Sequence, residues 1–193
     1  MKDENVLCVS CRIMNESFDM TVQHWKIDRS AIDKLPFVYL KRCEAEMNFE
    51  YKQIIPYAVF MNHNGEILCY QRHGSEKRLL DIYSVGIGGH VNDRDGGSTL
   101  SECLVSGLCR EVTEEVGLSL DPDSIRMAGM INEEITEVGH CHTGVVFVVK
   151  IDNSCLSFDS EIGNPQWLKS ADLDLSKFEL WSGLALQLIF DNV

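Results

Sequence analysis

The chain has 193 residues, with 17 lysines and arginines against 30 aspartates and glutamates, so its formal net charge is −13. Hydrophobic residues make up 45% and charged residues 24%, which is typical of a folded globular protein and excludes wholesale disorder. The negative charge argues against binding of a nucleic acid polymer, because such surfaces neutralise phosphates with basic side chains.

Residues 1–50 form the least patterned part of the chain. They are expected to contribute one strand at residues 6–9 and a short helix near residues 30–34, as an N-terminal extension packed on the core. Residues 51–193 are expected to form the main domain. Its predicted elements, in chain order, are strands at 54–61 and 66–72 joined by a turn at 62–65, a helix at 100–116, strands at 125–134, 144–151 and 166–168, and a closing helix at 178–190.

The helix at 100–116 has the clearest boundaries. Thr99 followed by Glu102 is a capping-box pattern, and Gly117 is a typical residue to end a helix. Strands on both sides of a long helix, in a chain of this size, indicate an α/β layered fold with a mixed sheet.

This helix carries three carboxylates on one stripe. At about 100° per residue, Glu114 lies ~60° to one side of Glu111 and Glu115 lies ~40° to the other. Clustered carboxylate oxygens suit a hard divalent cation such as Mg²⁺, with Mn²⁺ as the alternative, and Mg²⁺ commonly also binds substrate phosphates. The competing interpretation is a solvated acidic stripe. A bound cation would let this acidic chain take an anionic substrate.

The sequence from Gly96 to Leu118 resembles the Nudix box, G-x5-E-x7-R-E-U-x-E-E-x-G-U with U apolar, at every specified position. The order of elements is also similar to the α/β/α sandwich of the Nudix hydrolases. Further segments resemble a poorly characterised subgroup sometimes called predicted phosphoesterases; these are residues 51–57, 86–90 and 181–182.

The resemblance implies roles for four residues of the helix. Glu111 and Glu115 would be the main metal ligands, Glu114 a further ligand, and Arg110 would orient these carboxylates. A box glycine can also ligate the metal through its backbone. Gly96 has the expected spacing, but Gly89 ends a Gly-Gly pair 13 residues before Glu102, where the box has six. We favour Gly89 and expect a longer loop between it and the helix.

The remaining site residues are less narrowly defined. Arg72, Arg78 and His90 are candidates for binding the substrate, although the basic segment 72–78 is equally typical of a solvated loop. The family's catalytic base often lies well beyond the box. Four glutamates are candidates for this base: Glu133, Glu134, Glu137 and Glu161. Of these, Glu134 and Glu161 are preferred.

The resulting functional hypothesis is a metal-dependent hydrolase that splits a diphosphate linkage in a small molecule, such as a nucleoside diphosphate linked to another group. One alternative is a non-catalytic Nudix-like module that senses a nucleotide or nucleotide sugar, although the complete box argues against it. An isopentenyl-diphosphate isomerase would need a cysteine that residues 85–90 lack. Decapping of messenger RNA would need a basic segment after the helix. The family resemblance suggests a homodimer.

The eight cysteines are expected to be reduced thiols in a cytoplasmic protein. The Cys8–Cys11 spacing matches half of a zinc site, but a strand would point these two side chains to opposite faces. No apolar run approaches the roughly 18 residues of a membrane span. The first residues also lack the pattern of a signal peptide, so neither feature is expected.

Overall fold

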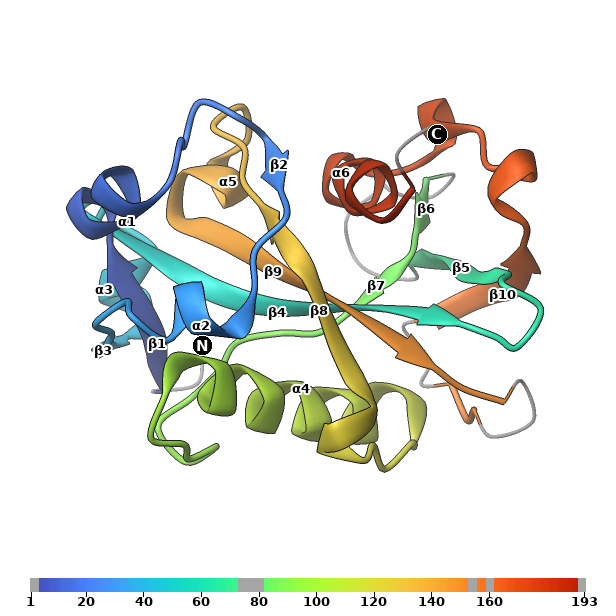
Figure 1. The fold of residues 1–193 in the computed structure, drawn as a ribbon, viewed down its shortest axis with the longest axis horizontal. Coiled ribbons are helices and arrows are strands. Elements are labelled where there is room, and N and C mark those ends of the chain that lie inside the picture. The colour runs from blue at the N-terminus through green and yellow to red at the C-terminus, as the bar shows by residue number, and fades with distance from the viewer. Residues whose placement is uncertain (1–3, 73–81, 153–155, 159–161, 191–193) are drawn as a thin grey trace.

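The computed structural model describes residues 4–72, 82–152, 156–158 and 162–190 (Figure 1). In chain order, the helices and strands are β1 Asn5–Ser10, α1 Cys11–Ser17, β2 His24–Trp25, α2 Arg29–Ile32, β3 Val38–Lys41, α3 Arg42–Ala45, β4 Tyr51–Met61, β5 Ile67–Arg72, β6 Tyr83–Ser84, β7 Gly86–Ile87, α4 Leu100–Val116, β8 Ile125–Ile131, α5 Glu137–Cys141, β9 His142–Lys150, β10 Ile162–Leu168 and α6 Leu180–Ile189. Short 3₁₀ helices lie at Pro122–Ser124, Ser170–Asp172 and Leu175–Lys177.

Within the described residues, ten strands form one mixed sheet. Its main path runs β10-β5-β4-β9-β8-β2, while β1 pairs with both β3 and β4. The central pair, β4 and β9, is parallel, and the other strand pairs are antiparallel. The apolar strand predicted at 144–151 is therefore central, because β9 lies between β4 and β8.

Two apolar clusters lie on opposite faces of this sheet. Alternate residues of β4 divide between them: Ala58 and Phe60 pack with α4, whereas Tyr57 and Val59 pack with α6. Figure 1 shows α4 below the sheet and α6 above it. This is the α/β/α sandwich that the sequence predicts.

The first fifty residues contribute to the same core. Leu7 and Val9 of β1, together with Met14, Ile32 and Leu35, are buried in the cluster that contains α4. The predicted strand at 6–9 and the helix near 30–34 are confirmed as β1 and α2. The boundary between extension and main domain at residue 50 stays a prediction.

The strand predicted at 125–134 is three residues too long, since β8 ends at Ile131. The chain turns there because the Glu133 carboxylate accepts hydrogen bonds from the backbone N–H groups of Ile135 (2.7 Å) and Thr136 (2.9 Å). The short helix α5, which has no periodic signal in the sequence, follows at once.

The boundaries of α4 agree with the prediction at both ends. The Thr99 hydroxyl accepts from the backbone N–H of Glu102, and the Glu102 carboxylate accepts from the N–H of Ser98 at 2.8 Å and of Thr99 at 3.3 Å. Gly117 ends the helix with φ at 66°, a left-handed conformation that glycine adopts without steric cost. Local side-chain chemistry therefore fixes the length of the helix that carries the acidic stripe.

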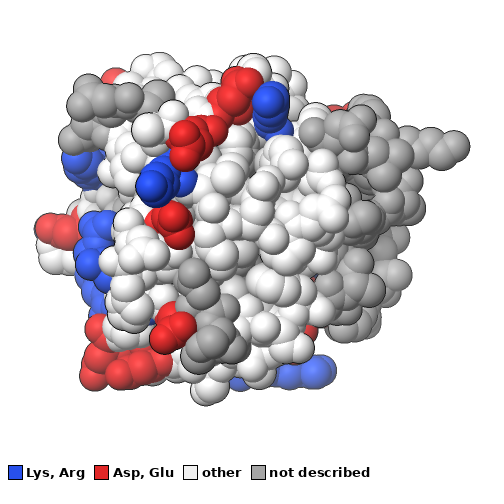
Figure 2. All heavy atoms as spheres, turned by 90° about the vertical axis from the view of Figure 1, so that its right-hand side faces the viewer, with Lys and Arg blue, Asp and Glu red and all other residues white. Residues whose placement is uncertain are grey.

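Charge is unevenly distributed over the surface. On the face shown in Figure 2, charged side chains follow the upper and left-hand margins, and uncharged side chains form most of the described centre. Within the described ranges, no helix is both long and apolar enough to cross a membrane.

Removing the cap should destabilise the protein measurably. Thr99→Ala leaves the Glu102 N–H without its side-chain partner and is expected to lower the free energy of unfolding by about 1 kcal/mol. Urea denaturation followed by circular dichroism measures the change. Ser119→Ala, at an exposed position just beyond the helix, is the control. An equal loss in both variants would contradict the assigned cap.

Candidate active site

Arg110, at the start of the last two turns of α4, is the centre of a polar cluster. Its Nε and Nη2 donate to the two Asp95 carboxylate oxygens at 2.7 and 3.0 Å, which makes a bidentate ion pair. Its Nη1 donates to Glu111 at 2.7 Å and to Glu114 at 3.4 Å, and Nη2 also donates to the His90 carbonyl at 2.8 Å. The expected contacts from Arg110 to Glu111 and Glu114 are confirmed.

Asp95 is the member of this cluster that sequence reasoning missed. It lies in the loop before α4, its side chain is only 4% exposed, and it also accepts from the Asn92 N–H at 2.8 Å. The Ser106 hydroxyl donates to the Asp95 carbonyl. These contacts tie the loop to the helix. The longer loop inferred from the Gly89 spacing is the signal that could have drawn attention to this acidic segment.

The three predicted carboxylates differ in exposure. The Glu111 side chain is 17% exposed and that of Glu114 is 62% exposed, while Glu115 is half-buried. Burial raises the pKa of Glu111, and the hydrogen bond from Arg110 partly offsets this. The hydrogen bonds to Asp95, together with those to Glu111, raise the pKa of the Arg110 guanidinium despite its partial burial. The Arg110 guanidinium at the centre of the cluster therefore keeps its positive charge.

The structure distinguishes the two candidate glycines by what lies beside them. A Cβ built on Gly89 would lie 2.7 Å from the Glu111 carboxylate carbon, so a larger residue here would require the Glu111 side chain to move. A Cβ built on Gly96, where φ is 75°, would meet no atom within 4 Å. Gly89 and not Gly96 therefore lies against the acidic stripe.

His90 forms a pair with His142 at the start of β9. Their Nε2 atoms are 3.2 Å apart, and Nδ1 of His142 lies 2.8 Å from the Val138 carbonyl. Because that carbonyl requires a donor, the proton of neutral His142 lies on Nδ1 and its Nε2 accepts from Nε2–H of His90. Burial is the main cause that holds the pKa of His90 at about 3, and it also lowers the pKa of His142.

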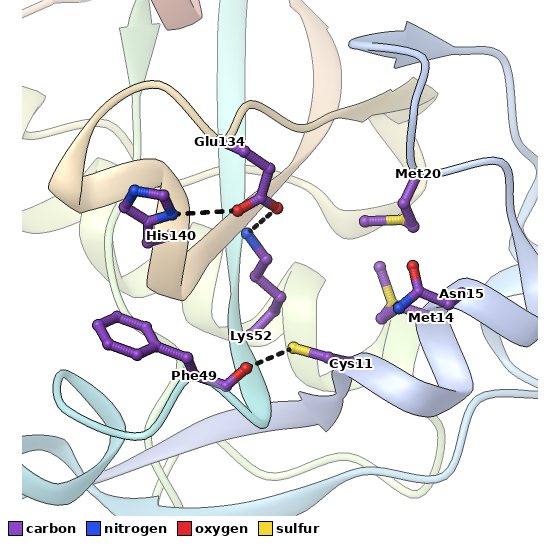
Figure 3. A pocket seen from close by; sticks show the side chains of 8 residues that line it. All are labelled: Cys11, Met14, Asn15, Met20, Phe49, Lys52, Glu134 and His140. Carbon is purple, nitrogen blue, oxygen red and sulfur yellow. Dashed lines mark hydrogen bonds and ion pairs between the residues drawn. The ribbon is translucent and has the colours of Figure 1, made fainter.

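The other predicted site residues lie elsewhere or cannot be placed. Arg72 ends β5, and Arg78 and Glu161 lie outside the described residues. Glu134 contacts Lys52 at 2.6 Å and His140 at 3.3 Å, so its carboxylate is engaged in an ion pair (Figure 3). Glu133 is 2% exposed, and its carboxylate accepts a hydrogen bond from the backbone N–H of Ile135 in the turn before α5.

The donor set beside Gly89 fits a hard divalent cation. Glu111 offers a half-buried carboxylate that lies where a Cβ on residue 89 would be. Mg²⁺ usually combines one or two carboxylates with several waters. Across the described part of the chain, no three His, Cys, Asp or Glu side chains are gathered closely enough to hold a metal by themselves. The donor set beside Gly89 therefore suits an ion that takes its remaining ligands from water or substrate.

Comparison with known proteins identifies the fold. No family model matches the chain. The protein YmaB of Bacillus subtilis (strain 168) is 28% identical over 160 residues, which cover 78% of this chain and 77% of YmaB. The crystal structure of Tm1382, a candidate Nudix hydrolase, superposes with a TM-score of 0.82 at 28% identity, over 98% of this chain and all of that one. The chain therefore has the Nudix fold and is similar over almost its whole length to a candidate Nudix hydrolase.

A more distant structure supports the fold alone. The Escherichia coli dihydroneopterin triphosphate pyrophosphohydrolase has a TM-score of 0.53 at 16% identity, over 72% of this chain and 96% of that one. The match to Tm1382, by contrast, spans almost the whole chain.

Replacing the histidine pair should flatten the pH dependence of stability. Below about pH 6.5 both histidines take up protons in the unfolded chain, whereas their lowered pKa values keep them neutral in the folded chain. The free energy of unfolding therefore decreases as the pH is lowered. Between pH 7 and pH 5 this amounts to up to about 2 kcal/mol per histidine.

Denaturation of the double variant H90Q/H142Q at these two pH values measures the effect. His63→Gln, in the exposed turn after β4, is the control. A double variant that loses as much stability on acidification as the wild type would contradict the assigned pair.

Proposed function

We propose that this Nudix protein hydrolyses a diphosphate linkage in a small molecule, of the class in which a nucleoside diphosphate is joined to another group. The observation that carries the proposal is the approach of Gly89 to the Glu111 carboxylate, held by Arg110 and Asp95. This arrangement brings a backbone segment and an acidic helix together where a cation and its anionic substrate can meet.

The charge balance of the cluster supports a divalent ion. One guanidinium contacts three carboxylates, those of Asp95, Glu111 and Glu114, so the cluster carries an excess of two negative charges. The half-buried Glu115 lies on the same stripe, one residue after Glu114. Mg²⁺ would neutralise it, and Mn²⁺ is the alternative. An anionic substrate would otherwise be repelled by a chain of net charge −13.

Each residue then has a defined task. Glu111, Glu115 and the backbone of Gly89 hold the cation, and Glu114 is a further ligand. Arg110 fixes the orientation of Glu111 and of the His90 carbonyl, while Asp95 holds Arg110. When bound, the cation supplies neutralisation of the diphosphate and activation of the attacking water. Glu134 and Glu161 remain the proposed bases, with Glu134 disfavoured because its ion pair with Lys52 makes its carboxylate a weaker proton acceptor.

Removing one ligand charge tests the proposal. Glu115→Gln keeps the size of the side chain but removes its charge, and is expected to lower the turnover number about 100-fold or more, since the cation supplies several kcal/mol of transition-state stabilisation. Phosphate release from nucleotide sugars, dinucleotides and nucleoside triphosphates, with Mg²⁺ or Mn²⁺ present, measures the change.

Glu16→Gln, on exposed α1, is the matched control and should retain wild-type turnover. Wild-type turnover in Glu115→Gln would contradict the proposed metal site. Tight nucleotide binding by the wild type without metal and without product would instead favour the sensing module.

A further inference from the structure

A cavity lies between the N-terminal extension and the sheet, outside the Arg110 cluster. Its volume is about 220 Å³, and eight residues from both parts of the chain line it (Figure 3): Cys11, Met14, Asn15, Met20, Phe49, Lys52, Glu134 and His140. None of them contacts Arg110, Glu111 or Gly89 in the described structure. A space of this size is below the 300–1,000 Å³ of pockets for drug-sized ligands, so it fits one ring system and not a whole nucleotide.

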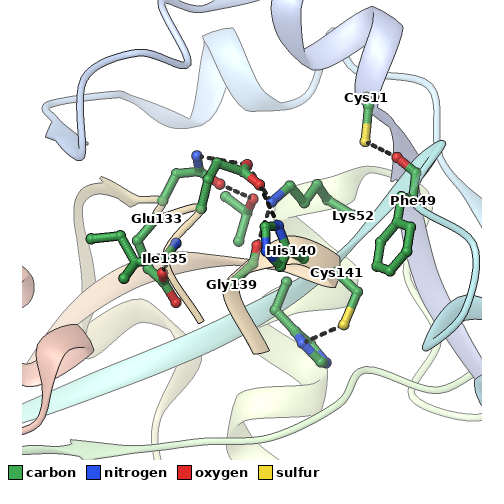
Figure 4. Close-up of polar contacts among 12 residues, drawn as sticks. Cys11, Phe49, Lys52, Glu133, Ile135, Gly139, His140 and Cys141 are labelled. Carbon is green, nitrogen blue, oxygen red and sulfur yellow. Dashed lines mark hydrogen bonds and ion pairs between the residues drawn. The ribbon is translucent and has the colours of Figure 1, made fainter. Parts of the chain in front are cut away.

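The polar wall of this cavity consists of Lys52, Glu134 and His140. The Lys52 side chain is 5% exposed, and its ammonium donates to Glu134 at 2.6 Å (Figure 3). It also donates to the Gly139 carbonyl (Figure 4). An ammonium has three N–H groups, so two acceptors among the described residues leave one donor for a ligand. The Glu134 carboxylate, 52% exposed, retains lone pairs beside this donor.

The opposite wall combines two methionine thioethers with the Asn15 amide. Figure 3 shows Met14, Asn15 and Met20 facing the Lys52–Glu134 pair. Thioethers pack favourably against aromatic rings. At the mouth, the Phe49 ring forms a T-shaped pair with the His140 ring, with the centroids 6.0 Å apart. Phe49 is 66% exposed, so part of its ring surface is available for stacking.

These walls define the chemistry of the ligand. The Lys52–Glu134 pair is neutral overall, which disfavours a bare anion such as phosphate. Instead it presents a donor next to an acceptor, which complements a ring that carries an acceptor next to a donor. We propose that the cavity binds a neutral planar heterocycle of the nucleobase type, recognised by Lys52 and Glu134 and stacked against Phe49.

Two sources could supply such a ring: a free base or nucleoside, or the base of the diphosphate substrate. The second source rests on the proposed hydrolytic function. Lys52 is four residues before Pro56 on β4, and the Pro56 carbonyl lies against Gly88, the neighbour of Gly89. At 3.3 Å per residue this separation is roughly 13 Å along the strand, which places the two sites within one molecule's reach.

Direct binding tests the proposal without any reaction. Calorimetry in EDTA measures the affinity of adenosine, cytidine, uridine and nicotinamide for the wild type, Phe49→Ala, Glu134→Gln and Lys52→Met. We expect at least one ligand to bind, and its affinity to fall about 10-fold in Phe49→Ala, the value of one aromatic stack. Glu134→Gln and Lys52→Met should weaken binding at least as much.

The controls separate this site from the fold and from the metal site. Met47→Ala changes an exposed residue of the same loop, 79% exposed, and Glu115→Gln changes the acidic stripe; both should bind like the wild type. Phe49 is exposed, so its variant reports on the site even if Lys52→Met fails to fold. A rise in KM with unchanged kcat in Phe49→Ala would assign the ring to the substrate, and unchanged kinetics would assign it to a free ligand.

Three results would overturn the proposal. The first is that none of the four compounds binds at millimolar concentration. The second is binding that Phe49→Ala and Glu134→Gln leave unaltered, or that Glu115→Gln abolishes. The third is binding of inorganic phosphate that depends on Lys52, because this would make the cavity an anion site. Loss of hydrolysis in every assay would leave the binding result intact, so the two proposals can fail separately.

Discussion

The site depends on one ion pair, between Arg110 of α4 and Asp95 of the preceding loop. Asp95 is almost fully buried, and a buried carboxylate requires a partner that supplies both charge and hydrogen bonds. Arg110 meets this need with two parallel N–H groups and still reaches Glu111 and the His90 carbonyl. The pair therefore sets the position of the loop relative to the helix, and with it the approach of Gly89 to Glu111.

This constraint explains how an acidic chain can present a site for an anion. The guanidinium orders the carboxylates without cancelling their charge, since it is outnumbered three to one. A helix that ends in adjacent carboxylates opposes its own dipole and pays a small cost in stability. The capping box at Thr99 and the Gly117 stop fix where the helix begins and ends, so that the stripe faces the loop. The sheet positions the other half of the site, because β7 runs beside β4 and leads directly to Gly88 and Gly89.

Structural features that depend on residues close together in the sequence could be predicted. Features that depend on contacts between distant residues could not. The helix at 100–116 and its caps were predicted residue by residue, because periodicity and capping act within a few positions. Gly89 was favoured over Gly96 from the Gly-Gly pair that it ends, although the spacing fits Gly96, and the contact with Glu111 supports that choice. Asp95 and Lys52 were missed because their partners lie 15 and 82 residues away. The Glu133 turn replaced a predicted strand end, since a buried carboxylate can satisfy backbone N–H groups that a strand would have paired.

The central claim is that Glu111, Glu115 and the backbone of Gly89 bind one divalent cation. Anomalous diffraction from crystals soaked in Mn²⁺ tests it most directly, because the ion is located independently of any assumed substrate. The account predicts an anomalous peak within bonding distance of the Glu111 and Glu115 carboxylates and of Gly89, and its loss in Glu115→Gln crystals. A wild-type crystal without a peak on this stripe, or with a peak only at other residues, would contradict it.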